Sequence, residues 1–443
     1  MSSPSVAGPV TRRQSLGVYA AALLLAACGR SDPPARAATD VVGQGLSDPV
    51  ARRFYELQGW RSSWTPALAR SLSEALAGAR AHGLDPHVFA PKLPAGDSAA
   101  ADENLTLAAL GYAKALAVGF VDPRSIEPVF TLARNQVDLA AGLAQALRGG
   151  GDIGAWLAGL APSDAEYRAL SAGYLAALGR TRRPAASARG APPARSTASG
   201  DQARQFAVNL ERRRWLVRDP PAHRIDVNTA AAFLDYLRPG APVVALRTVV
   251  GRDDHPTPCI EAPFQRLIAN PPWRVPTDIA RREILPKGRR YLRREHMRWV
   301  GGRLEQAPGP RCALGRVKFD VEDPYEIYLH DTPSKSLFAL RNRHRSHGCV
   351  RVENAVGLAR QIAAETGKAA ELDLALASRK TSEVELGQSI PVRMLYHTAY
   401  LGPAGKVVLV PDVYGTDSRL AAALGLGEAA AVARRREPSV FGP

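Results

Sequence analysis

The spacing of apolar residues changes character near the middle of the chain. Alanine and leucine recur at helical spacing over residues 46–182, as in ALARSLSEALAGARAHGL and LTLAALGYAKALAVGF. Breaks that contain aspartate or proline separate these runs, as expected between consecutive helices. The pattern therefore predicts a helical scaffold domain over 46–182, in which no motif indicates catalysis.

Alternating apolar and polar residues take over after residue 205. The short runs HRIDVN, VVALRTVVG, GRVKFDVE and YEIYLHD are bounded by proline, glycine and aspartate, which is typical of strands. Between the two patterns, residues 183–204 are rich in proline, alanine, serine and arginine without an apolar period, and they are predicted to be a linker. We expect an α+β protein, in which a mostly β domain over 205–426 follows the helical one.

Two further segments break the strand pattern. Residues 272–310 contain DIARREIL and RRYLRREHMRWV, a basic helical stretch that is predicted to be an insertion lying over the sheet. A second amphipathic run, AVGLARQIAAETG, begins after Asn354, and asparagine is a favoured helix N-cap. Residues 427–443 are predicted to be a polar tail.

The N-terminus has the pattern of an export signal. Two adjacent arginines precede an apolar run, Val18 to Ala27, that is too short for a good membrane-spanning helix. The sequence LAAC at its end resembles a bacterial lipobox, in which Cys28 would be lipidated. We expect a lipoprotein-type export signal over 1–28, a tether over 29–45, and a periplasmic protein anchored to a membrane. An uncleaved apolar segment is the alternative.

The net charge indicates which classes of molecule the protein is expected to bind. The formal charge is +16, and arginine supplies most of it. Such a balance favours contact with nucleic acid, a lipid surface or a carboxylate-rich polymer. The sequence has no zinc-finger spacing, basic zipper or aromatic RNA-reading signature, so nucleic acid is not expected as a partner.

The chain has four cysteines: Cys28, Cys259, Cys312 and Cys349. With Cys28 lipidated, an odd number remains in an oxidising compartment. One arrangement pairs Cys259 with Cys312 and leaves Cys349 free, and the alternative is three unpaired thiols. No CxxC spacing or glycine-rich phosphate loop is present, so neither a metal site nor a nucleotide cofactor is expected.

The motif RHRSHGCVRVEN places Cys349 among basic residues. A cysteine in this setting could be a nucleophile, a metal ligand or a buried thiol. The side chains of Arg343, Arg345 and Arg351, and the helix that follows, would lower its pKa below the usual value of about 8.5. This setting favours a nucleophilic thiolate.

A nucleophilic cysteine also needs a base within hydrogen-bonding reach. His330 ends the strand YEIYLH, and His347 lies two residues before Cys349, so both are candidates. Gly348 suits a tight backbone in which amides around Cys349 point at a developing oxyanion. The residues alone leave the choice of base open.

The spacing of these residues resembles a known family. His330, followed after fifteen residues by Ser346-His347-Gly348-Cys349, resembles the signature of YkuD-type L,D-transpeptidases. Further stretches resemble the large YcbB-like branch of that family. They are NLERRRWL, IDVN, GRDDHPTP, NPPWRVP, ALGRVKF, YLHDTPSKSLF and SHGCVRVEN. Together with the strand pattern, the resemblance predicts a sandwich-like pair of sheets in the catalytic domain.

The resemblance implies a role for each motif residue. Cys349 would be the acylated nucleophile and His330 the general base, while His347 and Gly348 would shape the site and Ser346 would hydrogen-bond within the loop. The family cuts a peptidoglycan tetrapeptide stem after its third residue and releases the terminal D-Ala. The amine of a neighbouring stem then attacks the thioester and forms a 3→3 crosslink, without a cofactor.

The resemblance also suggests residues that contact the stem peptide. Arg351 would hold a carboxylate of the donor stem bidentately, although it could instead pair with Glu353 or face solvent. The insertion corresponds to the substrate-capping segment of YcbB-like proteins, where Asn270, Trp273 and Tyr291 could contact substrate or simply pack.

The same residues are compatible with other functions. Water as acceptor would make the protein an L,D-carboxypeptidase, and a protein amine would make it an enzyme that anchors a protein to the wall. A non-catalytic cell-wall scaffold protein is an alternative of a different class. YcbB-like proteins usually carry a small peptidoglycan-binding domain where this chain has only the predicted linker, which leaves wall targeting in doubt. The sequence indicates no oligomeric state.

Overall fold

The computed structural model describes residues 41–95, 97–148, 151–182 and 194–427. The predicted export signal, the lipidation site Cys28, most of the tether and nearly all of the polar tail lie outside these residues. Among the described residues, no helix is both long enough and apolar enough to cross a membrane.

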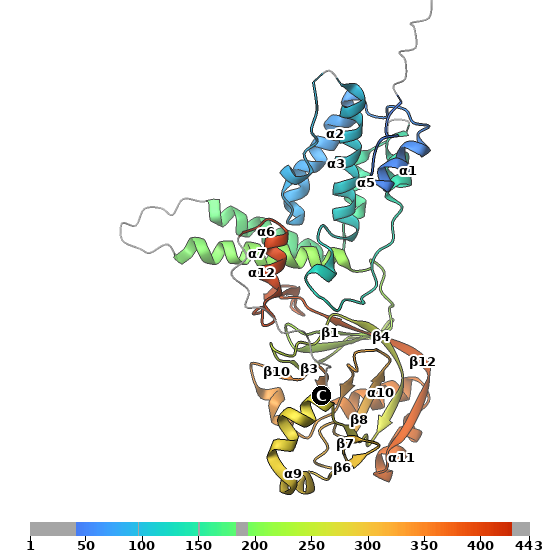
Figure 1. The fold of residues 1–443 in the computed structure, drawn as a ribbon, viewed down its shortest axis with the longest axis vertical. Helices are drawn as coiled ribbons and strands as arrows, with labels where there is room; N and C mark the ends of the chain where they lie inside the picture. The colour runs from blue at the N-terminus through green and yellow to red at the C-terminus, as the bar shows by residue number, and fades with distance from the viewer. Residues whose placement is uncertain (1–40, 96, 149–150, 183–193, 428–443) are drawn as a thin grey trace, which may run out of the picture. The chain divides into compact units, whose positions relative to one another are not determined.

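Seven α-helices form the first part of the described chain (Figure 1). They are α1 (Pro49–Leu57), α2 (Pro66–Ala77), α3 (Ser98–Val118), α4 (Leu139–Ala146), α5 (Ile153–Leu160), α6 (Ala165–Arg182) and α7 (Ala194–Trp215). Short 3₁₀ turns connect some of them: η1 (Gly78–His82), η2 (Pro86–Phe89) and η3 (Pro123–Ser125). An aspartate accepts backbone N–H bonds at the start of several helices, namely Asp48, Asp97, Asp138 and Asp152. The aspartates in the sequence breaks are therefore N-caps.

The predicted linker is shorter than expected, because helix α7 already begins at Ala194. Its composition suggested an irregular segment, but α7 packs against α6. Gly173 of α6 makes room for this contact, since a Cβ there would lie 2.6 Å from the ring of Phe206. The boundary predicted at residue 205 therefore falls inside a helix, and the β-rich part starts at Arg224.

The C-terminal segment also joins the helical part. Strands β13 (Ala399–Leu401) and β14 (Val407–Leu409) and helix α12 (Thr416–Ala423) follow the main sheet. Buried residues of this segment, such as Tyr396 and Leu420, share one apolar core with the helices. The predicted catalytic domain over 205–426 is thus divided among three cores: the one shared with the helices, that of the main sheet and that of the insertion.

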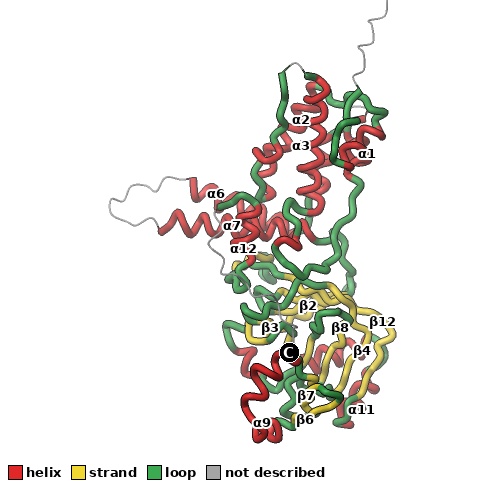
Figure 2. Tube along the Cα trace, in the orientation of Figure 1, coloured by secondary structure: helices red, strands yellow, loops and turns green. Residues whose placement is uncertain are grey.

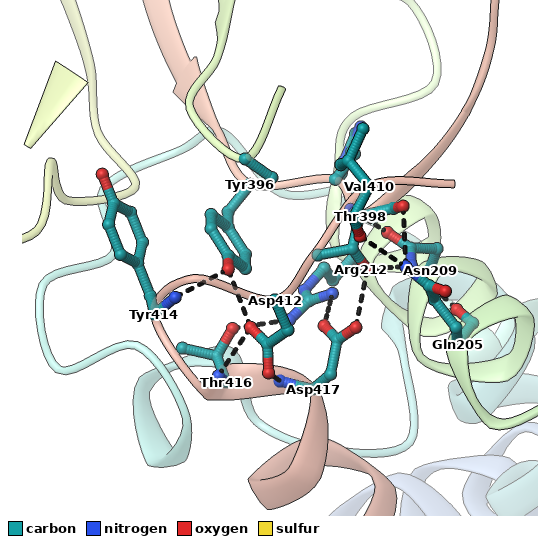
Figure 3. A network of polar contacts seen from close by, with 12 residues as sticks. Gln205, Asn209, Arg212, Tyr396, Thr398, Val410, Asp412, Tyr414, Thr416 and Asp417 are labelled. Carbon is teal, nitrogen blue, oxygen red and sulfur yellow. Dashed lines mark hydrogen bonds and ion pairs between the residues drawn. The ribbon is translucent and has the colours of Figure 1, made fainter. Parts of the chain in front are cut away.

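Polar side chains of α7 hold this segment in place. Figure 3 shows the Arg212 guanidinium bonded to Asp417 at 2.5 Å and to the Thr416 hydroxyl at 2.7 Å. Asn209 donates to the Thr398 hydroxyl at 2.7 Å, and Gln205 donates to two backbone carbonyls of the segment. A buried guanidinium paired with a carboxylate is costly to break, because its partner would be left uncompensated.

The β-rich part contains one nine-stranded sheet in the order β10-β3-β11-β9-β8-β4-β12-β1-β2 (Figure 2). The strands are β1 (Arg224–Asn228), β2 (Phe233–Leu237), β3 (Val244–Gly251), β4 (Glu261–Ala269), β8 (Val317–Val321), β9 (Leu329–His330), β10 (His344–Ser346), β11 (Val350–Val352) and β12 (Ser382–Leu395). Because β2 also pairs with β3, the sheet closes on itself. The α+β class is confirmed, but the predicted pair of sheets is instead a single closed sheet, whose closure depends on pairings between distant strands.

Helices α10 (Ala355–Glu365) and α11 (Ala369–Ser378) pack on this sheet. Leu358 and Ile362 of α10 belong to the same buried core as the strand residues and Cys349. Asn354 caps α10 through its side chain, as predicted, by accepting from the Gly357 N–H at 3.3 Å. The helix therefore begins at Ala355, six residues after the cysteine.

The insertion is a small structure of its own and is not only helical. It contains strands β5 (Trp273–Arg274), β6 (Met297–Val300) and β7 (Arg303–Gln306), helices α8 (Thr277–Ile279) and α9 (Gly288–Arg294), and the turns η5 (Ala280–Ile284) and η6 (Leu285–Lys287). The three strands form a separate sheet in the order β5-β7-β6. Its apolar core includes Cys312 and Leu314, so it extends past the predicted end at residue 310.

The predicted pairing of Cys259 with Cys312 is wrong, because both are free cysteines. Cys259 is buried in the core shared by the helices, whereas Cys312 is buried in the core of the insertion. The Cys312 thiol instead donates to the Pro271 carbonyl at 3.3 Å. Spacing along the chain could not reveal that the two thiols lie in different cores.

Candidate active site

Cys349 is the residue directly before strand β11, and it is fully buried. Its Sγ lies 3.4 Å from the backbone carbonyl of Glu326, with the thiol as donor. Burial raises the pKa of the Cys349 thiol to about 12. The resting state is therefore a protonated thiol that is closed off from solvent.

His330 lies at the end of β9, which pairs in parallel with β11. Leu329 stands opposite Val350, and His330 stands opposite Arg351. Because side chains alternate between the two faces of a strand, His330, Cys349 and Arg351 share one face. The parallel pairing thus brings together the two residues of the sequence signature, which are nineteen positions apart.

The His330 ring is oriented by one hydrogen bond. Its Nδ1 lies 2.5 Å from the carbonyl oxygen of Asp331, and a carbonyl can only accept, so Nδ1 carries the proton. The buried Nε2 has no hydrogen-bond partner among the described residues. Burial, followed by the nearby Arg351 charge, lowers the pKa of His330 to about 3. A neutral imidazole with an unprotonated Nε2 is suited to accept a proton.

The expected arginine cluster does not form around the thiol. Arg343 donates to the backbone carbonyls of Thr248, Ala231 and Ala232, and Arg345 is exposed. Of these three arginines only Arg351 acts on the thiol, and its effect is smaller than those of burial, of a backbone hydrogen bond from Tyr328 and of the Lys318 charge. The predicted lowering of the Cys349 pKa is therefore wrong, because desolvation outweighs the charges of Lys318 and Arg351 together.

Hydrogen bonds fix the loop that carries Cys349. The Ser346 hydroxyl donates to the Cys349 carbonyl at 2.6 Å and accepts from the Gly348 N–H at 3.2 Å. Gly348 has φ 121°, which a residue with a side chain rarely adopts. Ser346 and Gly348 therefore shape the loop.

Thr257 holds the same loop from the other side. Its hydroxyl donates to the Gly348 carbonyl at 2.6 Å and accepts from the Gly251 N–H at 3.0 Å. The Tyr414 hydroxyl donates to the Gly251 carbonyl at 2.8 Å, which links the loop to the C-terminal segment. Both residues were missed as site residues, although Thr257 lies in GRDDHPTP, a stretch that carries the family resemblance.

The His347 side chain bonds to the insertion. Its Nε2 lies 2.6 Å from a carboxylate oxygen of Glu283 in η5, and its ring packs edge-on against His255 with centroids 5.3 Å apart. Arg252 also reaches Glu283, at 3.3 Å. His347 thus connects the cysteine loop to the insertion, and His330 is the histidine placed to act as base.

Comparison with known proteins supports this interpretation. Residues 222–383 match the model of the YkuD family, described as an L,D-transpeptidase catalytic domain, and residues 49–173 match the model of the Scaffold domain. A protein of Haemophilus influenzae with the curated name "Putative L,D-transpeptidase" is 31% identical over 242 residues, which cover 49% of this chain and 48% of that protein. The chain spans about half the length of this relative.

The chain carries a YkuD-type L,D-transpeptidase catalytic domain. With the Scaffold domain before it, it has the YcbB-like arrangement that the sequence motifs predicted. The matched region contains both His330 and Cys349.

A cavity of about 440 Å³ lies between the sheet of the transpeptidase domain and the insertion, and its lining includes Glu326, whose carbonyl accepts from the Cys349 thiol. Tyr328 and Glu326 line it, and Lys318 reaches over the Tyr328 ring, with Nζ 4.2 Å from the centroid. The Tyr328 and His330 rings also lie close together, with centroids 5.7 Å apart. Sequence reasoning missed Tyr328, because a tyrosine two residues before the histidine reads as an ordinary strand residue.

Arg351 is nearly buried beside His330 and Cys349. Its Nε has no hydrogen-bond partner among the residues the structure describes, and burial lowers the pKa of its guanidinium. Glu353 is engaged elsewhere, since it forms an ion pair with Arg247. The alternative in which Arg351 pairs with Glu353 is therefore excluded, and Arg351 retains bonding capacity for an anion.

The three candidates from the insertion are engaged in packing. The Asn270 amide donates to the Ala375 carbonyl at 2.9 Å and to the Lys380 carbonyl at 3.2 Å, so it ties down the end of α11. Trp273 is buried in the core of the insertion. Tyr291 is partly buried beside that core, and the Lys287 ammonium and the Arg294 guanidinium lie over its ring. None of these contacts involves Cys349, His330 or Arg351.

Within the described ranges, no group of three or more His, Cys, Asp or Glu side chains is arranged to hold a metal ion.

Proposed function

We propose that this protein is a peptidoglycan L,D-transpeptidase that forms 3→3 crosslinks through a thioester on Cys349. The observation that carries the proposal is the pair of strands β9 and β11, which places His330, with its unprotonated and unpartnered Nε2, on the same face as Cys349. A histidine base beside a cysteine nucleophile is the arrangement that acyl transfer requires.

In the first step, His330 Nε2 takes the proton of the Cys349 thiol as Sγ attacks the carbonyl of the third stem residue. Neutral thiol and neutral imidazole are the starting state, so the proton moves as the bond to carbon forms. The N–H groups of Gly348 and Val350 are bonded to Ser346 Oγ and to the Tyr328 carbonyl, so the amide of Cys349 itself is the proposed oxyanion donor.

In the second half of this step, the tetrahedral intermediate collapses. The His330 imidazolium returns its proton to the leaving nitrogen, and D-Ala departs with both hydrogens on its amine. The bond from Nδ1 to the Asp331 carbonyl keeps the ring in one tautomer through both transfers. The product is a thioester on Cys349.

The thioester is then resolved by the side-chain amine of a second stem. His330, neutral again, accepts a proton from this amine as it attacks, and the thiolate leaves and regains the proton. Sulfur is thereby restored to the resting thiol, and the new amide joins two third-position residues.

Arg351 is proposed to bind a carboxylate of the donor stem. Its guanidinium lies across from His330 in the strand register, is nearly buried, and has an unsatisfied Nε. A carboxylate paired with it bidentately would be held next to the reacting carbonyl. This positioning would act on the donor and not on the acceptor stem.

We also propose that the protein is exported and anchored in a membrane through a lipidated Cys28, as the LAAC sequence indicates. The test is fractionation of cells that express a Cys28→Ala variant. Release of this variant into the soluble periplasmic fraction is expected, and retention in the membrane fraction would count against the anchor.

The test of the catalytic proposal uses a purified disaccharide-tetrapeptide as both donor and acceptor. The wild-type protein is expected to release D-Ala and form 3→3 dimers, and the Cys349→Ala and His330→Ala variants are expected to form neither. Cys312→Ala is the matched control, because that thiol is also buried but lies in the insertion core. D-Ala release without dimers would identify a carboxypeptidase, and activity in Cys349→Ala would refute the proposal.

A further inference from the structure

A second cavity lies on the face of the sheet opposite to the core that holds Cys349. It has a volume of about 410 Å³ and is bounded by α6, α7, β1, β2 and β12. Asp226 and Asp235 line it, whereas Val227 and Leu234 next to them are buried in the core that contains Cys349. Neither Cys349, His330 nor Arg351 lines this cavity, so it is separate from the candidate active site.

Asp235 is a carboxylate that forms no ion pair with any described residue, although the Arg224 charge acts on it from a distance. It stands directly opposite Asp226 in the antiparallel β1–β2 ladder, and like charges in that position are destabilising. Asp226 is neutralised by Arg393, with contacts of 2.7 Å, and by Arg224 at 3.0 Å. Within the described chain, no ion pair or side-chain hydrogen bond reaches Asp235. Burial, together with Asp226 and Glu166, raises the pKa of Asp235 to about 6.

Two more polar side chains facing the cavity are unsatisfied. Glu166 Oε1 is buried without a hydrogen bond to any described residue, and its ion-pair contacts are with Arg213 at 3.9 Å and with the His397 ring at 4.0 Å. The His397 side chain is 7% exposed, and no hydrogen bond within the described chain involves its ring nitrogens. Burial and three nearby arginines lower the pKa of His397 well below its usual value, so the ring is neutral and does not compensate Glu166.

The cations of this cavity are already engaged. Arg213 pairs with Asp164 at 3.1 Å, and Arg218 donates to backbone carbonyls, including those of Ala117 and Leu216. The two other arginines are those that pair with Asp226. The Nε atoms of Arg213 and Arg218 have no partner among the described residues, but the terminal nitrogens of both guanidinium groups are engaged. Asp235 is left without an ion pair, and the ion-pair contacts of Glu166 are 3.9 Å or longer, which favours a positively charged ligand.

Two aromatic rings complete the wall. Phe233 and Tyr400 both line the cavity, and their ring centroids lie 5.1 Å apart. Aromatic faces attract ammonium groups and pack against alkyl chains. The volume is within the range of small-ligand sites, whereas no described cluster has the three or more ligands expected for a metal ion.

We propose that this cavity binds a primary alkylammonium group, with Asp235 and Glu166 accepting its N–H bonds and with Phe233 and Tyr400 packing against its alkyl stem. Both the side chain of a diamino acid in a peptidoglycan stem and a free polyamine present this chemistry. Because none of Cys349, His330 and Arg351 lines the cavity, its occupancy is expected not to depend on the reaction at Cys349.

The test is isothermal titration calorimetry on the full chain with two probes, 1,5-diaminopentane and a stem tripeptide that ends in a diamino acid, and with pentan-1-ol as the uncharged control ligand. We expect at least one amine to bind and pentan-1-ol not to bind. Binding of the diamine alone identifies a free polyamine as the ligand, and binding of the tripeptide alone identifies the stem.

The decisive variant is Asp235→Asn, which keeps the shape of the side chain and removes its charge. It is expected to weaken binding of the amine at least tenfold, whereas Asp138→Asn, at an exposed ion pair with Arg53, leaves binding unchanged. Thermal unfolding of Asp235→Asn is expected at or above the wild-type temperature, because a like-charge pair is removed, and it serves as the folding control. Binding equal to wild type in Asp235→Asn, or no binding of either amine, would overturn the proposal.

A Cys349→Ala variant separates this site from the catalytic assignment. It is expected to bind the amine with wild-type affinity although it is inactive. Failure of the transpeptidase assay together with retained amine binding would leave the cavity proposal standing, and the reverse result would leave the catalytic proposal standing.

Discussion

At the scale of single residues, the most informative feature is the protonation state of the catalytic pair. Burial favours the neutral forms of both Cys349 and His330, and it moves their pKa values in opposite directions. The two side chains therefore do not form a thiolate–imidazolium pair in the resting protein. In the proposed mechanism, the proton transfer is part of the acylation step.

This state predicts the pH dependence of thiol alkylation. With a pKa of about 12, the thiolate fraction of Cys349 rises about tenfold per pH unit throughout the range from pH 7 to 9.5. The rate of iodoacetamide modification at Cys349, followed by peptide mass spectrometry, should rise in the same way without levelling off. A plateau below pH 8 would indicate a pre-formed thiolate and contradict this account.

The role proposed for Arg351 predicts a loss of activity that depends on the shape of the side chain and not only on its charge. Arg351→Lys keeps the charge but loses the planar fork, and hydrogen bonds to charged groups are worth about 1.5–3 kcal/mol. We expect kcat/KM for the tetrapeptide donor to fall about 10- to 100-fold. The exposed Arg345, substituted in the same way, should have no effect, and an equal loss in both variants would argue for a general charge effect.

At the scale of elements, the cysteine loop is held by strands and loops that come from distant parts of the sequence. Thr257 joins the Gly348 carbonyl to the Gly251 N–H, and Tyr414 fixes Gly251 from the C-terminal segment. The loop geometry therefore depends on packing between segments that are up to 163 residues apart.

Thr257→Val should show this dependence. The substitution removes one donor and one acceptor in a buried place, which costs about 1–3 kcal/mol of stability. It should also lower kcat at least tenfold with little change in KM, because small displacements of a nucleophile are costly. Thr257→Ser keeps the hydroxyl and should retain activity, so equal defects in the two variants would contradict the positioning role.

Helix α7 offers a second prediction at this scale. Arg214 and Glu211 form a fully buried ion pair at 2.5 Å. Arg214→Met should lower the free energy of unfolding by about 3–5 kcal/mol, because Glu211 is left as a buried and uncompensated charge. Arg53→Met, at a pair in which both side chains are about half exposed, should cost less than about 1 kcal/mol. Denaturant unfolding of both variants gives the comparison, and similar losses would contradict it.

At the scale of the whole molecule, the sequence predicted the order of the parts better than their limits. The α+β class and the helical domain before a β-rich one followed from apolar spacing, and the His330–Cys349 pair followed from motif spacing. The start of α7 could not be predicted in this way, because its Ala- and Ser-rich composition gives no apolar period. Its packing against α6 decides that this segment is helical. Closure of the sheet and the separate positions of Cys259 and Cys312 also depend on contacts that no local pattern contains.

The same limit applies to the electrostatics of the molecule. Arginines adjacent to Cys349 in the sequence predicted a lowered pKa, but the fold turns Arg343 toward backbone carbonyls and buries the thiol. Asp235 and Asp226 are nine residues apart and unremarkable in sequence, yet the β1–β2 register places them opposite each other. Charge effects in this protein follow from register and burial more than from neighbours along the chain.

The central claim is that Cys349 carries the acyl group of the donor stem. The most direct measurement is the mass of the peptide containing Cys349 after brief incubation of the wild-type protein with a tetrapeptide donor that lacks an acceptor amine, followed by acid quenching. The account predicts an added mass equal to the donor minus D-Ala, located on Cys349 and reduced in amount in His330→Ala. An adduct on any other residue, or turnover without an adduct on Cys349, would contradict it.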